Sequence, residues 1–346
     1  MKFNFLLLPM LCISALSQAQ IPDAGVEFSY KDWDLICNRT GQCQARGYSP
    51  GDGKDGVSVS FTREAGPYVL FEGSLDFAEL SGKPPSLPVT LLIDDEVIGE
   101  VRSEGGPFGE YRFILDDYHI QGLITALAGN THIQFVDAQN RSWKLSDAGA
   151  TAILIKMDEL QERIQTPGAA IMKGDENEDW VPRPRPRSQH FIDKKQLVDT
   201  RAGDEFLASV SAVREALSKA LDHRHRCPDL KNSENIQPLK IERLNEHRLL
   251  VSTQCSNNSF TTKMGFWVTE DRPPYLSKLV TDVGTRFDRN RAEIGSWQKQ
   301  NALGDCVKTS YWKWDGVSFL LDFRTNSMRC RGFKNGASNI PSYVGD

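Results

Sequence analysis

The stretch that decides the fold of this chain is residues 304–332, GDCVKTSYWKWDGVSFLLDFRTNSMRCRG. Two strand-like runs flank the dipeptide Asp315-Gly316. Asp-Gly between such runs is a strong signal for a type I′ hairpin turn, because both central residues of that turn need a positive φ. The stretch therefore predicts an antiparallel hairpin near the end of the chain.

The turn fixes the register of this hairpin. A two-residue turn at Asp315-Gly316 places Trp314 opposite Val317 and Trp312 opposite Phe319. Because side chains alternate along a strand, both tryptophans then share one apolar face and Lys313 lies on the other. We expect the tryptophans to be core residues, and a platform that stacks on carbohydrate is the alternative.

The two cysteines of the same stretch predict a disulfide that links the two ends of the hairpin. Extending the ladder sets Cys306 opposite Thr325, so Cys330 reaches Cys306 only if the chain turns back within residues 327–329. We expect a Cys306–Cys330 disulfide.

The remaining mature cysteines are assigned less directly. In CNRTGQC a three-residue loop, residues 39–41, with a left-handed glycine sets Cys37 opposite Cys43. Their use in a zinc site is disfavoured by the spacing of five residues and by the lack of a nearby histidine or thiol. By elimination Cys227 pairs with Cys255, although six cysteines allow about fifteen pairings.

The first residues predict export. Residues 1–19 combine one lysine, an apolar run from Phe5 to Leu16 and a small-residue pattern that places cleavage after Ala19, as in a secretory signal peptide. The residue before Cys12 is a leucine, which argues against a lipoprotein. The apolar run is shorter than the roughly 20 residues of a membrane span, so no span is expected after cleavage. We expect a periplasmic or secreted protein with disulfides in place of free thiols.

The charge balance excludes one class of partner. The whole chain of 346 residues has a net charge of −5, and removing residues 1–19 leaves 40 basic and 46 acidic residues. No basic stripe is present to neutralise phosphates, so nucleic acid is not an expected partner. The sequence leaves the oligomeric state open.

Composition divides the mature chain in two. Residues 166–195 include an acidic cluster and three prolines that alternate with arginines, which predicts an extended, semi-rigid linker. A ligand for a proline-recognising groove or for an acidic surface is the alternative. The linker separates a β-rich domain, 20–165, from an α+β domain, 196–346, that contains the Trp-Asp-Gly hairpin.

Each domain is expected to join a sheet or sandwich-like core to one main helix, so the fold class is α+β and mostly β. Period-two alternation marks residues 57–63, and hairpins are expected in residues 89–101 and 131–145. Helical spacing marks two apolar stripes. They are Ile153, Met157, Leu160 and Ile164 in the first domain, and Phe206, Val210, Val213, Leu217 and Leu221, capped by Asp204, in the second.

Several motifs together resemble a known family. FSYKDWDLICNRTGQCQARGY, FTREAGP, ATAILIKMDELQERIQTP and the stretch that opens this section are similar to the bacterial domain-of-unknown-function family 1176. The N-terminal half is also loosely similar to the invasion-associated locus B family of exported β proteins. The resemblance implies an exported protein of Gram-negative bacteria. The chain departs from the family pattern at Val307, where glycine commonly follows the cysteine.

The sharpest candidate for metal chemistry is the pair His223 and His225. On a strand the two imidazoles would share a face and bind zinc or copper. The predicted helix turns them apart by about 200°, and Cys227 is needed for a disulfide, so no metal or cofactor is assigned. The adjacent carboxylates Asp94, Asp95 and Glu96 lie at a predicted hairpin tip, where charges are solvated.

No catalytic residue is assigned, because the sequence holds no nucleophile elbow, zinc-protease motif or phosphate-binding glycine loop. We therefore favour a binding or envelope-interaction module, with another envelope protein or a glycan as partner, over an enzyme. The alternative is a hydrolase acting on an envelope polymer or glycan. A concave pocket that holds a histidine or two carboxylates with shifted pKa values would favour the hydrolase.

Overall fold

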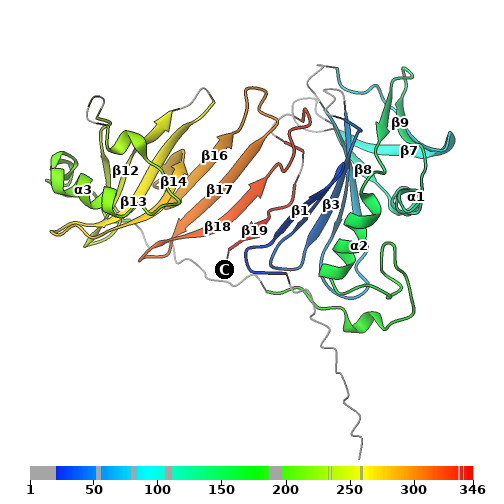
Figure 1. Ribbon diagram of the computed structural model, residues 1–346, viewed down its shortest axis with the longest axis horizontal. Helices are drawn as coiled ribbons and strands as arrows, with labels where there is room; N and C mark the ends of the chain where they lie inside the picture. The colour runs from blue at the N-terminus through cyan, green and yellow to red at the C-terminus, as the bar shows by residue number, and fades with distance from the viewer. Residues whose placement is uncertain are drawn as a thin grey trace, which may run out of the picture.

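The computed structural model describes residues 21–345 apart from 52–55, 79–82, 106–110, 187–196, 233, 235, 258–259, 334–335 and 338. The predicted signal peptide, residues 1–19, lies outside the described residues. Strands dominate, and three α-helices occur in the part of the chain that is described, so the fold class is α+β and mostly β as expected (Figure 1).

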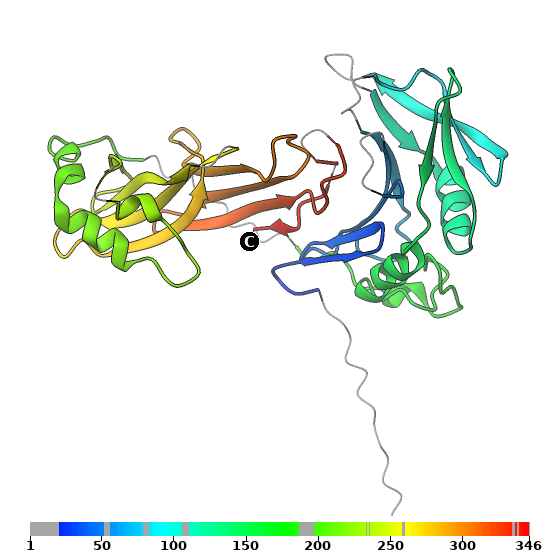
Figure 2. The same cartoon turned by 45° about the horizontal axis from the view of Figure 1, so that its top comes forward.

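The first half of the chain forms one antiparallel sheet of ten strands, in the order β1-β2-β3-β4-β5-β8-β7-β6-β9-β10. The strands are β1 (Val26–Tyr30), β2 (Trp33–Cys37), β3 (Cys43–Tyr48), β4 (Val57–Arg63), β5 (Glu72–Phe77), β6 (Val89–Ile93), β7 (Glu96–Gly105), β8 (Tyr111–Leu115), β9 (Ile133–Asp137) and β10 (Ser142–Leu145). The sheet bends so that β10 lies near β4 (Figure 2).

Two helices cover the inner face of this sheet. The expected helix is α2 (Ala150–Leu160), and Ile153 and Met157 of its predicted stripe are fully buried. The other helix, α1 (Asp117–Leu127), is an addition to the single helix expected from the sequence. Asp116 caps α1 by accepting a hydrogen bond from the backbone N–H of His119 at 2.9 Å. The core between helices and sheet is one continuous cluster.

The second half of the chain contains a four-stranded and a five-stranded antiparallel sheet. The four are β11 (Lys240–Arg243), β12 (Arg248–Asn257), β13 (Thr262–Glu270) and β14 (Ser277–Gly284), and the five are β15 (Arg286–Asp288), β16 (Glu293–Lys299), β17 (Val307–Trp314), β18 (Phe319–Asn326) and β19 (Tyr343–Val344). Helix α3 (Ser211–Lys219) packs on the four-stranded sheet, at the end of the molecule away from the first sheet (Figure 1).

The start of α3 differs from the sequence-based expectation. A short 3-10 helix, η3 (Glu205–Ser209), precedes α3, and Val210 between them has an extended backbone. Asp204 was expected to cap a continuous helix, but its carboxylate accepts two hydrogen bonds from the buried Arg243 guanidinium instead. Phe206, the first residue of the predicted stripe, lies in η3 and is 71% exposed, so it does not belong to the core.

The Trp-Asp-Gly hairpin is present, but its register is not the expected one. Trp314 pairs with Phe319 and Trp312 with Leu321, because the turn is centred on Gly316 and Val317, and Asp315 donates its backbone N–H to the Ser318 carbonyl. The Asp315 carboxylate accepts the backbone N–H of Val317 and of Ser318 at 2.7 Å each. This acceptor shifts the turn forward by one residue.

Next to the turn, the shift moves each cross-strand pair by two residues and therefore keeps Trp312 and Trp314 on their expected face. A register shift between Tyr311 and Trp312 displaces the pairs beyond it by one residue more. Trp314 is 2% exposed, and Trp312 packs partly buried against the same core cluster. Val317, at the tip, is 59% exposed. The tryptophans thus face the core, while the predicted partner of Trp314 is at the surface.

Three disulfides join Cys37 to Cys43, Cys227 to Cys255 and Cys306 to Cys330. The first closes the short β2–β3 hairpin, in which Gly41 has a φ of +92°. The second ties the segment after α3 to β12. In the third, the chain turns back through Met328, which has a φ of +58°.

Residues 166–186, expected to be part of a linker, pack along the first sheet. Ala170 belongs to the first core, Val181 is buried, and the backbone N–H of Arg185 donates to the Thr40 carbonyl at 3.1 Å. The rest of the expected linker, residues 187–195, lies outside the described residues. The division into two domains stays a proposal.

The last part of the chain covers the outer face of the first sheet. Arg329 donates to Asp34 of β2 at 2.7 Å, and Phe333 packs on Tyr48 of β3 with the ring centroids 6.0 Å apart. Because of this cover, polar residues of that face such as Ser58 are buried. Both views show β19 beside β1 (Figures 1 and 2).

Candidate functional site

The candidate site is a cleft of about 750 Å³ where three turns of the second half meet. The turns are those between β11 and β12, between β13 and β14, and between β17 and β18. We call it the tip cleft. Its lining consists of Asn245, Glu246, His247, Arg248, Glu270, Asp271, Arg272, Gly316 and Val317.

Asn245 shapes the first of these turns. Its Oδ1 accepts the backbone N–H of His247 at 3.0 Å and of Arg248 at 2.9 Å, as in a turn stabilised by an asparagine side chain. Its Nδ2 donates to the Gly316 carbonyl at 3.2 Å, and Arg248 donates to the Val317 carbonyl. The Asp-Gly hairpin tip is thereby attached to the β11–β12 turn and forms one wall of the cleft.

Arg243 lies beneath the cleft and organises it. The side chain is 2% exposed, and its guanidinium binds both carboxylate oxygens of Asp204, at 2.5 and 2.8 Å, and one oxygen of Asp271 at 3.1 Å. It also donates to the carbonyls of Asn245 and Glu246 at 3.1 Å each. The hydrogen bond from Arg243 holds the pKa of Asp204 below its ordinary value, and the same bond raises the pKa of Arg243.

The side chains of the cleft divide into anchored and accessible groups. Asp271 is bound to Arg243, and Glu246 is bound to Arg201. His247 and Arg272 are exposed on two different turns. The cleft therefore presents positively and negatively charged side chains on a backbone that is fixed by hydrogen bonds. It suits a polar ligand that both donates and accepts hydrogen bonds.

His223 and His225, the metal candidates of the sequence, lie in the loop that follows α3. His223 is exposed, and the Nδ1 of His225 lies 2.6 Å from Asp222 Oδ1. Hydrogen bonds from the Arg224 side chain and backbone, together with His225, lower the pKa of Asp222. Neither histidine lies near the tip cleft lining.

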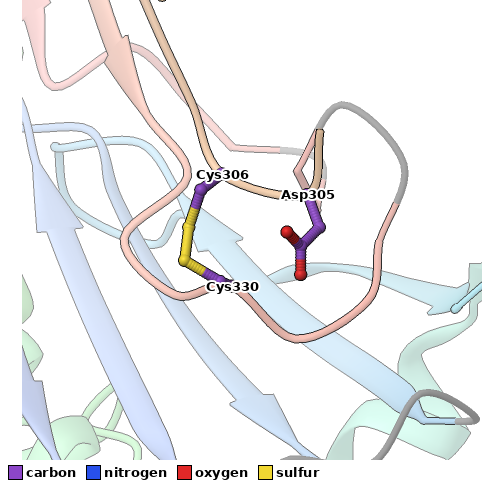
Figure 3. Close-up of side chains that lie close together, drawn as sticks. All are labelled: Asp305, Cys306 and Cys330. Carbon is purple, nitrogen blue, oxygen red and sulfur yellow. A yellow bond between two sulfur atoms is a disulfide. The ribbon is translucent and has the colours of Figure 1, made fainter. Parts of the chain in front are cut away.

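Within the described residues, the cluster with metal-ligand spacing is Asp305, Cys306 and Cys330, but its two sulfurs form a disulfide and are not thiolates (Figure 3). The buried Asp305 carboxylate accepts from Asn301 Nδ2 at 2.6 Å and from the Gly332 backbone N–H at 2.8 Å. Its hydrogen bonds fix the two chain segments that the disulfide joins, so the cluster is a structural staple.

The three carboxylates at the predicted hairpin tip are placed as expected. Asp94 and Asp95 form the turn between β6 and β7, with φ values of +49° and +65°. Asp94 accepts the backbone N–H of His132 at 2.7 Å, and Asp95 accepts the Gln134 side chain at 3.2 Å. These carboxylates stabilise the neighbouring turn.

Sequence reasoning missed the tip cleft because its residues come from three turns far apart in the chain. The available signal was a concentration of charges in two turns, NEHR at 245–248 and EDR at 270–272, next to the Asp-Gly dipeptide. Each run by itself is typical of a solvated turn.

Among the described residues, no helix has both the length and the apolar character required to span a membrane.

Comparisons with known proteins place the chain in a family. The family model described as "Protein of unknown function (DUF1176)" matches residues 27–344. The protein described as "Uncharacterized protein YpfG" from Escherichia coli (strain K12) is 23% identical over 350 residues, which cover 92% of this chain and 90% of the relative. No solved structure matches the chain. The comparisons do not show the similarity to the invasion-associated locus B family. The chain belongs to the DUF1176 family.

Proposed function

We propose that this DUF1176 protein is an exported binding module and that the tip cleft binds a glycan of the bacterial envelope. The observation that carries the proposal is the lining of the cleft, which contains both hydrogen-bond donors and hydrogen-bond acceptors among its charged and amide side chains. Arg243 fixes the backbone of this lining by donating to the carbonyls of Asn245 and Glu246. A polyhydroxylated ligand donates and accepts hydrogen bonds at each hydroxyl, so it can use both kinds of group.

Three disulfides support a place outside the cytoplasm, where thiols are oxidised. The volume of about 750 Å³ is within the range of small-molecule sites. It accommodates a short oligosaccharide.

A hydrolase is the second candidate, and one observation favours it: the cleft brings His247 together with the carboxylates of Glu246 and Glu270. The ion pair of Glu246 with Arg201 favours binding over proton transfer, because it engages the Glu246 carboxylate. Glu270 is then the carboxylate that a hydrolase would use.

The test is calorimetric titration of the full mature chain with two probes, muramidase-digested peptidoglycan fragments and lipopolysaccharide core oligosaccharide. Arg272→Ala and His247→Ala remove exposed side chains of the cleft and leave its anchor intact. We expect at least one probe to bind and each variant to weaken it by about tenfold, the effect of losing one charged hydrogen bond.

Arg286→Ala is the matched control, because Arg286 is an exposed arginine of the same half on β15. Absence of binding by both probes, or an equal loss in Arg286→Ala, would refute the proposal. Mass spectrometry of the same mixtures reads out the second candidate: cleaved fragments that disappear with Glu270→Gln would identify a hydrolase.

A further inference from the structure

Three strongly exposed large side chains of the first half lie on two adjoining loops. Trp180 is 81% exposed, Leu70 68% and Tyr68 66%. The hydroxyl of Tyr68 donates to Asp179 Oδ1 at 3.0 Å, so the loop before β5 and the 3-10 turn η2 (Glu178–Trp180) are in contact. We call Tyr68, Leu70, Asp179 and Trp180 the aromatic platform.

Buried charges hold both loops in place. Arg163, which is fully buried, donates to the Gly66 carbonyl on one loop and to the Glu178 carboxylate on the other. Glu178 is 3% exposed and also accepts the backbone N–H of Gly168 at 3.0 Å. The exposed Trp180 therefore lies two residues after a buried, ion-paired glutamate.

A second buried pair supports the first. Arg63 lies 2.5 Å from Asp158 of α2, and both side chains are fully buried. The Asp158 carboxylate also accepts the backbone N–H of Ala170 at 2.7 Å. Buried ion pairs contribute little net stability compared with apolar residues, but they fix one arrangement of the groups they join. Here they fix the loops that carry the platform.

The backbone of Tyr68 is in an unusual conformation. Its φ is +60°, a region that aromatic residues rarely adopt. Such conformations persist where the surrounding structure enforces them, and they concentrate at binding and active sites. In this chain the strained residue displays its ring to solvent.

Acidic side chains outnumber basic ones among the exposed residues of the two loops and their flanks. In residues 64–72 and 172–185 the exposed acidic residues are Glu64, Glu72, Asp175, Glu176 and Asp179, and the exposed basic residues are Lys173, Arg183 and Arg185. Exposed tryptophan and tyrosine are the residues that most often anchor protein interfaces, and a guanidinium stacks favourably on a tryptophan ring. Carboxylates beside the ring add charge complementarity for the same guanidinium.

We propose that the aromatic platform docks a basic protein segment, with an arginine or an apolar side chain seated against Trp180. The surface is separate from the tip cleft, which lies in the second half of the chain. The proposal therefore does not depend on the proposed glycan site.

The test measures fluorescence anisotropy of two labelled peptides with the full mature chain, one alternating arginine with leucine and one alternating glutamate with leucine. We expect the arginine peptide to bind, Trp180→Ala to weaken it at least tenfold, and added salt to weaken it further, since exposed charges are screened. The double variant Asp175→Asn, Glu176→Gln should weaken binding severalfold and reduce the salt dependence.

Phe206→Ala is the matched control, because Phe206 is an aromatic residue that is 71% exposed in the second half. The proposal is overturned if the arginine peptide does not bind, if the glutamate peptide binds as well, or if Trp180→Ala behaves like Phe206→Ala. Binding of chitohexaose that depends on Trp180, in place of peptide binding, would also overturn it and identify a carbohydrate platform.

Discussion

Trp312 and Trp314 show how two residues on one face contribute differently to a core. Both contact the cluster formed by β12, β13, β16, β17 and β18. Trp314 is buried, with its ring centroid 5.2 Å from that of Phe319, whereas Trp312 is partly buried. Lys313 between them points to the opposite face, where it pairs with Asp322 at 2.7 Å. We therefore expect truncation of Trp314 to lower the stability of the fold more than truncation of Trp312.

We expect Trp314→Ala to lower the free energy of unfolding by roughly 3 to 5 kcal/mol, the range for deleting a large buried aromatic side chain. Trp312→Ala should cost less, because part of its ring stays in contact with water. Lys313→Ala is the control and should cost at most about 1 kcal/mol, since an exposed ion pair contributes little. Chemical denaturation of the three variants gives the order, and a Trp314→Ala chain as stable as Lys313→Ala would contradict it.

The β9–β10 hairpin shows how one side chain builds a turn. Asp137 closes β9 and is 3% exposed. Its carboxylate accepts the backbone N–H groups of Ser86, Gln139 and Arg141, each at 2.9 Å, and the Arg141 side chain at 2.8 Å. Burial by itself would raise the pKa of Asp137, but these hydrogen bonds outweigh it and lower the pKa to about 2.

This lowered pKa predicts a pH dependence of stability. An unfolded aspartate titrates near pH 3.9. The ionised Asp137 therefore stabilises the fold fully above about pH 4, and this contribution is lost as the pH falls through about 2. We expect Asp137→Asn to be less stable than the natural chain at pH 7 and the difference to shrink between about pH 4 and 2.

Denaturation curves collected across that pH interval check the prediction. The exposed carboxylate of Glu100, on strand β7 of the same sheet, provides the control variant Glu100→Gln, which should change stability by less than about 0.5 kcal/mol. A destabilisation by Asp137→Asn that is the same at pH 2 as at pH 7 would show that the charge of Asp137 does not contribute.

At the scale of the whole molecule, the segment around Cys330, residues 329–333, joins the two halves of the chain. Arg329 binds Asp34, Arg331 binds Asp32 at 3.1 Å, and Phe333 covers Tyr48. Burial raises the pKa of the Tyr48 hydroxyl, with a further contribution from Asp34. The polar outer face of the first sheet is therefore an internal interface between halves.

We expect trypsin to cut the native chain first within residues 187–195, which contain Arg187, Lys194 and Lys195. The flanking residues are held, because Arg185 is hydrogen-bonded to Thr40 and Leu197 packs on the core of the second half. The two fragments should still elute together in gel filtration, since residues 329–333 keep the halves joined.

The double variant Arg329→Ala, Arg331→Ala should release the fragments after the same cut, while its uncut chain elutes as one species. Two separate peaks from the cut natural chain would contradict the role given to this segment. A first cut within residues 57–145 would contradict the proposed boundary.

The sequence by itself determined the features that depend on neighbouring residues. Period-two alternation located β4, a hairpin tip at Asp94, Asp95 and Glu96 was visible in the chain, and the Cys37–Cys43 pair follows from a three-residue loop. The tryptophans of the last hairpin were assigned to the correct face although the register was not, because a shift of two residues preserves the alternation.

Only the tertiary structure decided where distant segments meet. Asp204 does not cap α3, because a buried Arg243 that is 39 residues away binds it more strongly than a helix terminus would. Residues 166–186 read as a linker by composition, yet the ion pairs of Arg163 and Asp158 hold them on the first sheet. The tip cleft and the aromatic platform likewise join turns that are separated by tens of residues. Their contacts form only after long loops have closed. The entropic cost of that closure cannot be derived from a local sequence pattern.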